Sequence, residues 1–298
     1  MKIIKKNQYK FKKVSNNIKN VSSFALYGLC GNVTIKRVVK VSKFLYKKRP
    51  RIVAMLSIGE PKETIEKINR CLSQGAEGFC LLYQSCPSEF KTKDNLKKIM
   101  DVARKKPVYF ANYIRDNSQS ELSDDILAQQ LLEAIDIGAQ LIDVRTDMFC
   151  RSTDEVTCDS SAVEQQKSLI SEIHNRGAEV IMSTHIFEYR SPQNVLEIAK
   201  LQQERGVDIA KVVTTVDSKK ELDDAFKTLF LLKENLNIPF LFLTNGSFHR
   251  YHRIVGPLLG SCIYLCVENS NVGVTQPTID EAKMMIEKVA MIKEYKND

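Results

Sequence analysis

Two ionisable residues on neighbouring apolar runs are the part of the sequence best suited to chemistry. His185 ends the run at residues 179–185, and Lys211 lies within the run at 207–213. Residues 191–205, between the runs, have the apolar spacing of an amphipathic helix with a proline in its first turn. A strand–helix–strand unit of this length forms the right-handed crossover of a parallel sheet. It would place an imidazole and an amine on neighbouring strands, within reach of one small molecule.

Lys211 is the less expected of the two residues, because an amine inside an apolar strand loses its solvation. Burial disfavours the ammonium form and lowers the pKa, which makes a lysine nucleophilic toward carbonyl groups. Two structural explanations need no chemistry. In one, Lys211 extends to water from the rim of the sheet; in the other, it forms an ion pair with Asp208. Residue spacing alone leaves all three explanations open.

One pattern repeats from residue 51 onward: a short apolar run is followed by an amphipathic stretch. The apolar runs lie at residues 52–56, 78–83, 108–113, 141–144, 179–185, 207–213, 239–243 and 262–267. The amphipathic stretches lie at residues 61–74, 91–105, 124–137, 160–175, 191–205, 218–235, 253–259 and 278–292. Eight strand–helix units in roughly 250 residues predict an α/β fold, the (β/α)8 or TIM barrel.

A doubly wound open sheet is the alternative to a barrel. It is less favoured because no glycine-rich phosphate loop follows any of the predicted strands. In a barrel, chemistry collects at the C-terminal ends of the strands. That rule selects Tyr113, Arg145, His185, Lys211, Arg253 and Gln276.

The first fifty residues differ in charge from the rest of the chain. They contain 14 of the 44 Lys and Arg residues and no Asp or Glu, so the remainder is mildly acidic. We predict a basic N-terminal arm at residues 1–22 and one barrel domain at 23–298 that opens with a hairpin at 24–33. The arm is interpreted as a solvated terminus. The alternatives are a transit peptide, which would favour Arg over Lys, and a patch for an anionic surface or nucleic acid, which no motif supports.

The composition indicates a soluble globular protein. Hydrophobic residues make up 43% of the chain and charged residues 27%. No stretch approaches the roughly 18 apolar residues that a membrane span needs. The eight cysteines form neither a CxxC motif nor a His/Cys cluster, so a zinc site is not expected. Scattered thiols are typical of a reducing compartment, and we expect a cytoplasmic protein without a nucleic-acid partner.

Four segments resemble the type I 3-dehydroquinate dehydratases, (β/α)8 enzymes that form a Schiff base. Ser-Thr-His-Ile-Phe at 183–187, followed by Arg-Ser-Pro at 190–192, resembles that family's S-x-H-D-F…T-P. Asp-Ile-Ala-Lys at 208–211 resembles its D-I-x-K, and residues 253–261 resemble its S-R-x-x-G…G-S. Gln276 stands where the glutamine of A-P-G-Q would fall. The likeness covers the second half of the chain and extends weakly back to about residue 50.

The resemblance implies a mechanism. Lys211 would condense with a ring ketone to an iminium, an electron sink that acidifies the adjacent C–H. His185 would remove that proton and then protonate the departing β-hydroxyl. Arg253 would clamp the substrate carboxylate with two prongs, and Gln276 would bind a ring hydroxyl or the carboxylate. The covalent amine takes the place of a cofactor, and no metal, nucleotide or flavin is implied. The expected partners are a small oxo-acid and, since barrels commonly dimerise through exposed helices, a second copy of the chain.

Positions on the second and third strands depart from the family pattern. The family's Glu and Arg in E-x-R appear here as Cys80 and Leu82, and the Arg of its T-x-R appears as Tyr113. These replacements should make the pocket less polar. A site built to hydrogen-bond several hydroxyls discriminates strongly in their favour, and a site without those groups does not.

Two further departures concern charge. The fourth-strand D-x-E ends here in Arg145, which reverses a charge. The family's glutamate that orients the histidine falls near Asn117, an amide that stabilises an imidazolium less than a carboxylate does; Arg115 and Asp116 are potential displaced substitutes. Tyr113, Asn117 and Arg145 are therefore taken as candidate substrate contacts. The run FHRYHR at 248–253 is either a solvated basic loop or part of a pocket for a more highly charged anion.

Three functions are consistent with these residues. The first is dehydration of 3-dehydroquinate in the shikimate pathway, and the second is Schiff-base lyase or aldolase chemistry on a different oxo-acid. The third is a catalytically impaired binding or regulatory protein. Retention of both His185 and Lys211 argues against the third function. Loss of the strand arginines and the pocket glutamates argues against a fully proficient form of the first.

Overall fold

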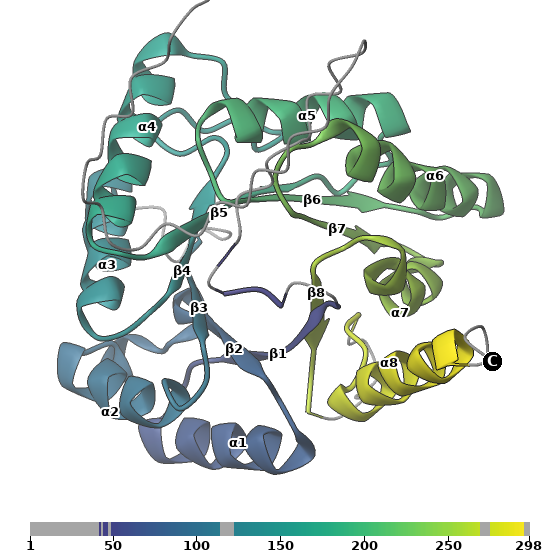
Figure 1. Ribbon diagram of the computed structural model, residues 1–298. Coiled ribbons are helices and arrows are strands. Elements are labelled where there is room, and N and C mark those ends of the chain that lie inside the picture. Colours follow the sequence, from purple (N-terminus) through teal and green to yellow (C-terminus); the bar gives the residue numbers. More distant parts are fainter. Residues whose placement is uncertain (1–41, 43, 47–48, 114–121, 269–274, 295–298) are drawn as a thin grey trace, which may run out of the picture. The chain divides into compact units, whose positions relative to one another are not determined.

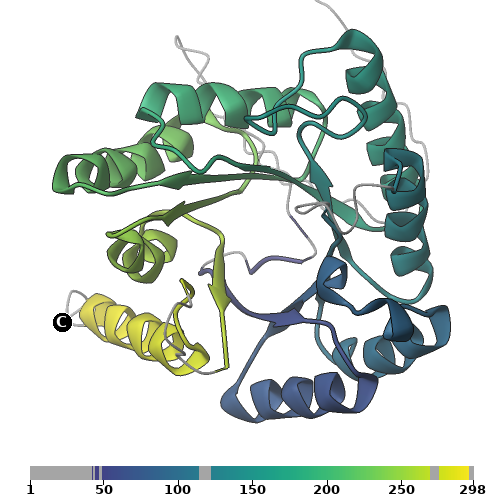
Figure 2. The same ribbon diagram turned by 180° about the vertical axis from the view of Figure 1, so that it is seen from behind.

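Eight strands and eight α-helices alternate along the part of the chain that the computed structural model describes, residues 42, 44–46, 49–113, 122–268 and 275–294. The strands are β1 (Arg51–Ser57), β2 (Gly78–Leu82), β3 (Val108–Ala111), β4 (Leu141–Arg145), β5 (Glu179–His185), β6 (Ile209–Thr215), β7 (Phe240–Asn245) and β8 (Ile263–Cys266). The helices are α1 (Pro61–Gln74), α2 (Lys93–Ala103), α3 (Asp124–Asp136), α4 (Ser160–Asn175), α5 (Pro192–Glu204), α6 (Lys219–Asn235), α7 (His249–Leu259) and α8 (Ile279–Glu294). The helices surround the strands on the outside (Figure 1 and, from behind, Figure 2).

The strands form a nearly closed parallel barrel. Their order is β7-β6-β5-β4-β3-β2-β1-β8, so the last strand pairs with the first. The seam between β7 and β8 is joined just before β8. The Cys262 N–H donates to the Phe240 carbonyl at 2.9 Å, and the Ser261 hydroxyl both accepts from the Phe242 N–H and donates to the Phe242 carbonyl at 3.0 Å. The predicted (β/α)8 TIM barrel is confirmed.

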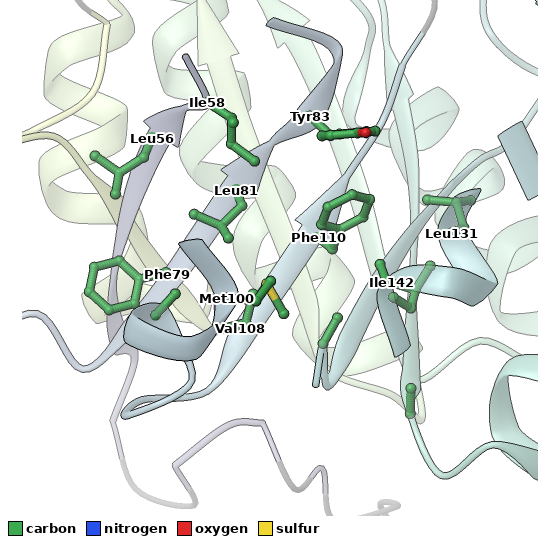
Figure 3. Packing of buried hydrophobic residues seen from close by; sticks show 14 of the residues in the cluster. Leu56, Ile58, Phe79, Leu81, Tyr83, Met100, Val108, Phe110, Leu131 and Ile142 are labelled. Atoms are coloured by element: carbon green, nitrogen blue, oxygen red, sulfur yellow. The ribbon is translucent and has the colours of Figure 1, made fainter. Parts of the chain in front are cut away.

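The core has two layers because side chains alternate between the two faces of each strand. One layer fills the barrel and includes Tyr109, Leu141 and Ile181. The other lies between strands and helices. Figure 3 shows part of this outer layer, where Phe110 of β3 and Ile142 of β4 lie with apolar residues of α2 and α3. Fully burying an aliphatic or aromatic side chain of this size contributes roughly 1.5–3 kcal/mol.

Phe44 closes the N-terminal end of the barrel. Its side chain is buried and packs with the residues of the barrel interior. The Glu179 carboxylate, at the first residue of β5, holds this segment by accepting hydrogen bonds from the Phe44 N–H at 2.9 Å and the Ser42 hydroxyl at 2.8 Å. The predicted arm at 1–22, the hairpin at 24–33 and the domain boundary between residues 22 and 23 lie outside the described residues.

Two expectations from the composition concerned the cysteines and a membrane span. Seven cysteines lie in the described segments, and none of them forms a disulfide bond there. Within those same segments, none of the helices has the length and apolar character to cross a membrane.

The run at residues 248–253 is not a loop. Helix α7 begins at His249, four residues earlier than predicted, because the His249 imidazole and N–H both contact the Gly246 carbonyl at the turn before it. Arg250 pairs with Glu281 of α8. His252 is buried. The interpretation of this run as a solvated basic loop is therefore wrong, and Arg253 is the member that lines a cavity.

His252 is a buried neutral histidine. Its ring lies 5.0 Å from the Phe242 ring and 5.7 Å from the Phe226 ring, measured between centroids. Neither ring nitrogen has a hydrogen-bond partner among the described residues. Burial, with a smaller contribution from the charge of Arg253, lowers the pKa of His252 to about 3.

We expect His252 to make the fold acid-sensitive. Between pH 6.5 and about 3 the unfolded chain binds a proton at this residue and the folded chain does not, so stability falls as pH falls. The slope is about 1.4 kcal/mol per pH unit at its steepest. The variant His252→Leu should lose this contribution and should be at least as stable as the wild type at pH 7, because two unpaired buried nitrogens are removed. Urea unfolding from pH 4 to 7 measures both effects. Equal acid sensitivity of the two proteins would contradict the assignment.

Candidate active site

A cavity of about 200 Å³ lies at the C-terminal ends of the barrel strands. Five of the residues predicted from the sequence line it: Tyr113, His185, Lys211, Arg253 and Gln276. The barrel thus brings together side chains that are up to 163 positions apart in the chain. The predicted placement of the amine and the imidazole at one mouth of the barrel is found.

Lys211 is held by a buried cluster of oxygen atoms. Its Nζ lies 2.9 Å from the Tyr113 hydroxyl, 3.0 Å from the Tyr109 hydroxyl and 3.1 Å from Asp143 Oδ2. Both tyrosine hydroxyls also donate to Asp143 Oδ2, and the Ser183 hydroxyl donates to Asp143 Oδ1 at 2.5 Å. Every member of this cluster points into the barrel from β3, β4, β5 or β6, or from the residues directly after β3.

Both structural explanations for Lys211 are wrong. The side chain is 6% exposed, so it does not extend to bulk water. Its ion-pair partner is Asp143, not Asp208. Asp208 faces away from the cavity, accepts from the Val180 N–H at 2.8 Å and lies 2.7 Å from His174 Nε2.

The protonation of Lys211 also differs from the sequence-based expectation. Burial lowers the pKa of Lys211, but the adjacent Asp143 carboxylate and the Tyr113 hydroxyl raise it by more, and the net pKa lies above its usual value. The same attraction holds the pKa of Asp143 below its usual value in spite of burial. Burial alone would have produced a neutral amine. The pocket is instead arranged to hold a cation at Nζ, and an iminium is a cation at the same atom.

His185 is oriented by a carboxylate that sequence reasoning missed. Glu155 Oε2 lies 2.8 Å from His185 Nδ1 and 2.9 Å from the backbone nitrogen of the same residue. Glu155 lies in the irregular segment after β4 and has a left-handed backbone with φ of 50°. A non-glycine residue in this conformation costs of order 1–3 kcal/mol, which is a feature of functional sites. The Tyr113 ring packs edge-on against the imidazole at 5.2 Å between centroids, so Tyr113 touches both predicted catalytic groups.

The expectation that His185 lacks a carboxylate partner is therefore wrong. Asn117, to which we assigned the orienting position, lies outside the described residues, as do Arg115 and Asp116. The orienting group comes from the loop after β4. No signal in the sequence marks Glu155, because the segment has no periodicity and the family motif places the glutamate after the preceding strand.

Arg145 is not at the cavity. It is buried, and its Nε and Nη2 lie 2.9 and 2.6 Å from Asp147 Oδ1. Arg145 stands where the family motif has a glutamate, and Asp147, two residues further on, neutralises its positive charge. Arg145 is not among the residues that line this cavity, so the structure does not support the candidate substrate contact there.

Arg253 and Gln276 carry buried polar atoms without a partner. Arg253 Nε donates to the Thr244 carbonyl at 2.7 Å, and Nη2 donates to Asn245 Oδ1 at 2.9 Å. Arg253 Nη1 and Gln276 Oε1 have no hydrogen-bond partner among the described residues. Because Nε is engaged, the expected two-pronged clamp would use Nη1 and the second N–H of Nη2. Burial lowers the pKa of Arg253 to about 10, which still leaves it cationic at neutral pH.

Helix α5 fixes the backbone behind the site. The Gln202 side chain accepts from the Lys211 N–H and donates to the Lys211 carbonyl, both at 3.0 Å. It also donates to the Thr146 hydroxyl at 2.9 Å. One turn later, Arg205 donates to the Thr146 carbonyl at 2.6 Å and to the Thr157 carbonyl. These contacts anchor both the strand of Lys211 and the two ends of the loop that carries Glu155.

A metal centre has no ligand set in the described segments, where no group of three His, Cys, Asp or Glu side chains could hold an ion.

Fold and site together define a class: (β/α)8 barrel proteins whose pocket presents a lysine paired with one carboxylate beside a histidine held by another. The chain belongs to the type I 3-dehydroquinase family, whose model matches residues 52–292.

Similar proteins agree with this family. The chain is 28% identical over 137 residues to a 3-dehydroquinate dehydratase from Geobacillus sp. (strain WCH70), which is 46% of this chain and 53% of that protein. It is 25% identical over 126 residues to the 3-dehydroquinate dehydratase from Alkaliphilus oremlandii (strain OhILAs), which is 42% of this chain and 49% of that protein. The chain thus spans about half the length of the curated relatives it matches.

Solved structures show the shared fold over a longer stretch. The 3-dehydroquinate dehydratase from Geobacillus kaustophilus HTA426 superposes with a TM-score of 0.69 at 15% identity, covering 82% of this chain and 92% of that one. The type I enzyme from Clostridium difficile, solved with covalently modified comenic acid, superposes with a TM-score of 0.70 at 17% identity, covering 82% and 94%. At these identities the superpositions establish the fold alone.

Proposed function

We propose that this chain is a type I 3-dehydroquinate dehydratase-like lyase that dehydrates a cyclic 3-oxo acid through an iminium on Lys211. The observation that carries the proposal is one cavity in which a buried amine and an oriented imidazole share Tyr113 as a neighbour. Arg253 Nη1, buried and unpartnered, supports an anionic substrate. In this proposal the enzyme belongs to the shikimate pathway in the cytoplasm, and the covalent amine serves where other lyases use a cofactor.

The first step is condensation at Lys211. The ammonium group passes a proton to Asp143, whose Oδ2 is 3.1 Å away, and the neutral amine attacks the ketone carbon. The carbinolamine then loses water to give the iminium. Asp143 stabilises the cation before and after the condensation, because both the ammonium and the iminium carry their positive charge at Nζ. Preorganised charge of this kind is usually the largest contribution to catalysis.

The second step is elimination through His185. Glu155 accepts the hydrogen bond of Nδ1, and in this tautomer the lone pair that acts as base is on Nε2. Nε2 removes the proton from the carbon next to the iminium and forms an enamine. The imidazolium then gives its proton to the β-hydroxyl, which leaves as water. Hydrolysis of the conjugated iminium releases the enone and restores the amine, so the net change is the loss of one water molecule.

Appearance of a conjugated enone tests this function. Purified full-length protein is incubated with 3-dehydroquinate, and ultraviolet absorbance at the enone band is followed, with product identity checked by mass spectrometry. We expect steady turnover that scales with enzyme concentration and persists in Lys227→Met, a change at an exposed lysine of α6. Failure to dehydrate any cyclic 3-oxo acid with a β-hydroxyl would contradict the proposal.

A second candidate function, Schiff-base chemistry on a different oxo-acid, is favoured by one specific observation. Much of the cavity wall is hydrocarbon. Met55, Leu82 and Leu265 line it alongside the ionisable residues.

A further inference from the structure

The apolar side of the cavity forms one continuous wall. Met55 of β1, Cys80 and Leu82 of β2, and Leu265 of β8 all line the cavity. These three strands are neighbours in the order β2-β1-β8, and Met55 stands directly opposite Cys80 in the register. Thioether, thiol and branched hydrocarbon groups are weak hydrogen-bonding partners at best. A substrate that rests against this wall meets little that can bind a hydroxyl.

The other side, called the polar side, carries the two catalytic candidates. Lys211 and His185 project from β6 and β5, which lie across the barrel from β2 and β1 (Figure 1). Tyr113 bridges between them. Arg253 of α7 and Gln276, which follows β8, add the unpartnered donor and acceptor described above. Together these groups can hold a ketone, a departing hydroxyl and one carboxylate at the same time.

Three further polar side chains line the cavity, Gln84, Asn245 and Thr275, and the side-chain oxygens of the first two are engaged. Gln84 Oε1 accepts from the Tyr113 N–H at 3.4 Å, and Asn245 Oδ1 accepts from Arg253 at 2.9 Å. Using either oxygen for a substrate hydroxyl would break a contact that positions a residue of the polar side. These two oxygens therefore do not offset the apolar wall.

We propose that this site is specific for a cyclic oxo-acid that carries one carboxylate, the ketone and the departing β-hydroxyl, and is otherwise unsubstituted hydrocarbon. The inference rests on the proposed function. The ring edge remote from the reacting carbons lies against Met55, Cys80, Leu82 and Leu265. Each additional hydroxyl on that edge loses its water without gaining a partner, which reduces kcat/KM by roughly tenfold or more.

Two substrates separate this inference from the proposed function. The first is 1-hydroxy-3-oxocyclohexane-1-carboxylate, which loses water to give 3-oxocyclohex-1-ene-1-carboxylate. The second, 3-dehydroquinate, has the same three groups and two more ring hydroxyls. We expect kcat/KM for the first compound to exceed that for the second by about tenfold or more. Equal values, or a preference for 3-dehydroquinate, would overturn the inference and leave the proposed function standing. If neither compound is dehydrated, both fail.

Wall variants test the physical cause. Cys80→Ser and Leu82→Gln add hydrogen-bonding groups to the wall, and their combination should move the kcat/KM ratio toward 3-dehydroquinate by about tenfold. Cys71→Ser is the matched control, since Cys71 is equally buried but lies in the outer layer of the core. It should leave the ratio unchanged. An unchanged ratio in the folded double variant, verified by circular dichroism and cooperative melting, would show that the wall does not set specificity.

Discussion

Replacing Lys211 with Met reduces dehydration by at least about 10⁴-fold, and no covalent adduct with an oxo-acid remains. The iminium is the electron sink in the proposed mechanism, and a thioether cannot form one. Steady-state turnover and intact-protein mass after borohydride treatment measure the two effects. Turnover near the wild-type rate would show that the reaction does not pass through this amine.

The control for Lys211→Met must take account of Asp143, whose buried carboxylate loses its partner in this variant. Removing one partner of a buried ion pair costs about 3–5 kcal/mol, so Lys211→Met alone risks a folding defect. The double variant Lys211→Met/Asp143→Asn removes both charges and should melt cooperatively. Loss of activity in a folded double variant then reports on chemistry rather than on folding.

Replacing His185 with Ala slows dehydration by about 10²–10⁴-fold, the usual contribution of a positioned acid–base group. In contrast with the lysine variant, iminium formation remains, since the attacking nitrogen is unchanged. Borohydride should therefore trap an adduct in His185→Ala that accumulates because elimination stalls. Absence of both adduct and turnover in a folded His185→Ala protein would place the imidazole in the condensation step instead.

Glu155→Gln gives a graded version of the same test. A glutamine can accept from Nδ1 but stabilises the imidazolium less than a carboxylate does, so kcat should fall by less than in His185→Ala with little change in KM. Glu188→Gln is the matched control, because that carboxylate is 76% exposed and pairs with Arg190 at the surface. A rise in KM with unchanged kcat would indicate that Glu155 shapes the pocket without orienting the base.

The fold was accessible from the sequence because local signals and barrel geometry agree. Each strand is an apolar run, and helix starts carry clear caps, such as Ser218 with Glu221 at α6 and Ser191 with a proline after it at α5. The start of α7 was misplaced because a run of His and Arg resembles a solvated loop. Its helical face becomes apparent only when His252 is seen to pack against Phe242.

Only part of the site could be predicted from the sequence, for a physical reason. Strand ends can be located from periodicity, so Lys211 and His185 could be assigned to one rim. Side-chain pairings across the barrel depend on stagger between strands, which no local pattern encodes. Asp143 was consequently seen as a motif residue and not as the partner of Lys211. Glu155 could not be found at all, since an irregular loop brings it back to His185.

Borohydride trapping with peptide mapping is the most direct measurement of the central claim. The wild-type protein is incubated with the cyclic oxo-acid, reduced, digested and analysed by tandem mass spectrometry. The account predicts one adduct, with the mass of the substrate or product joined through a secondary amine to Lys211. An adduct on another lysine, or none under conditions where the enone is formed, would contradict it.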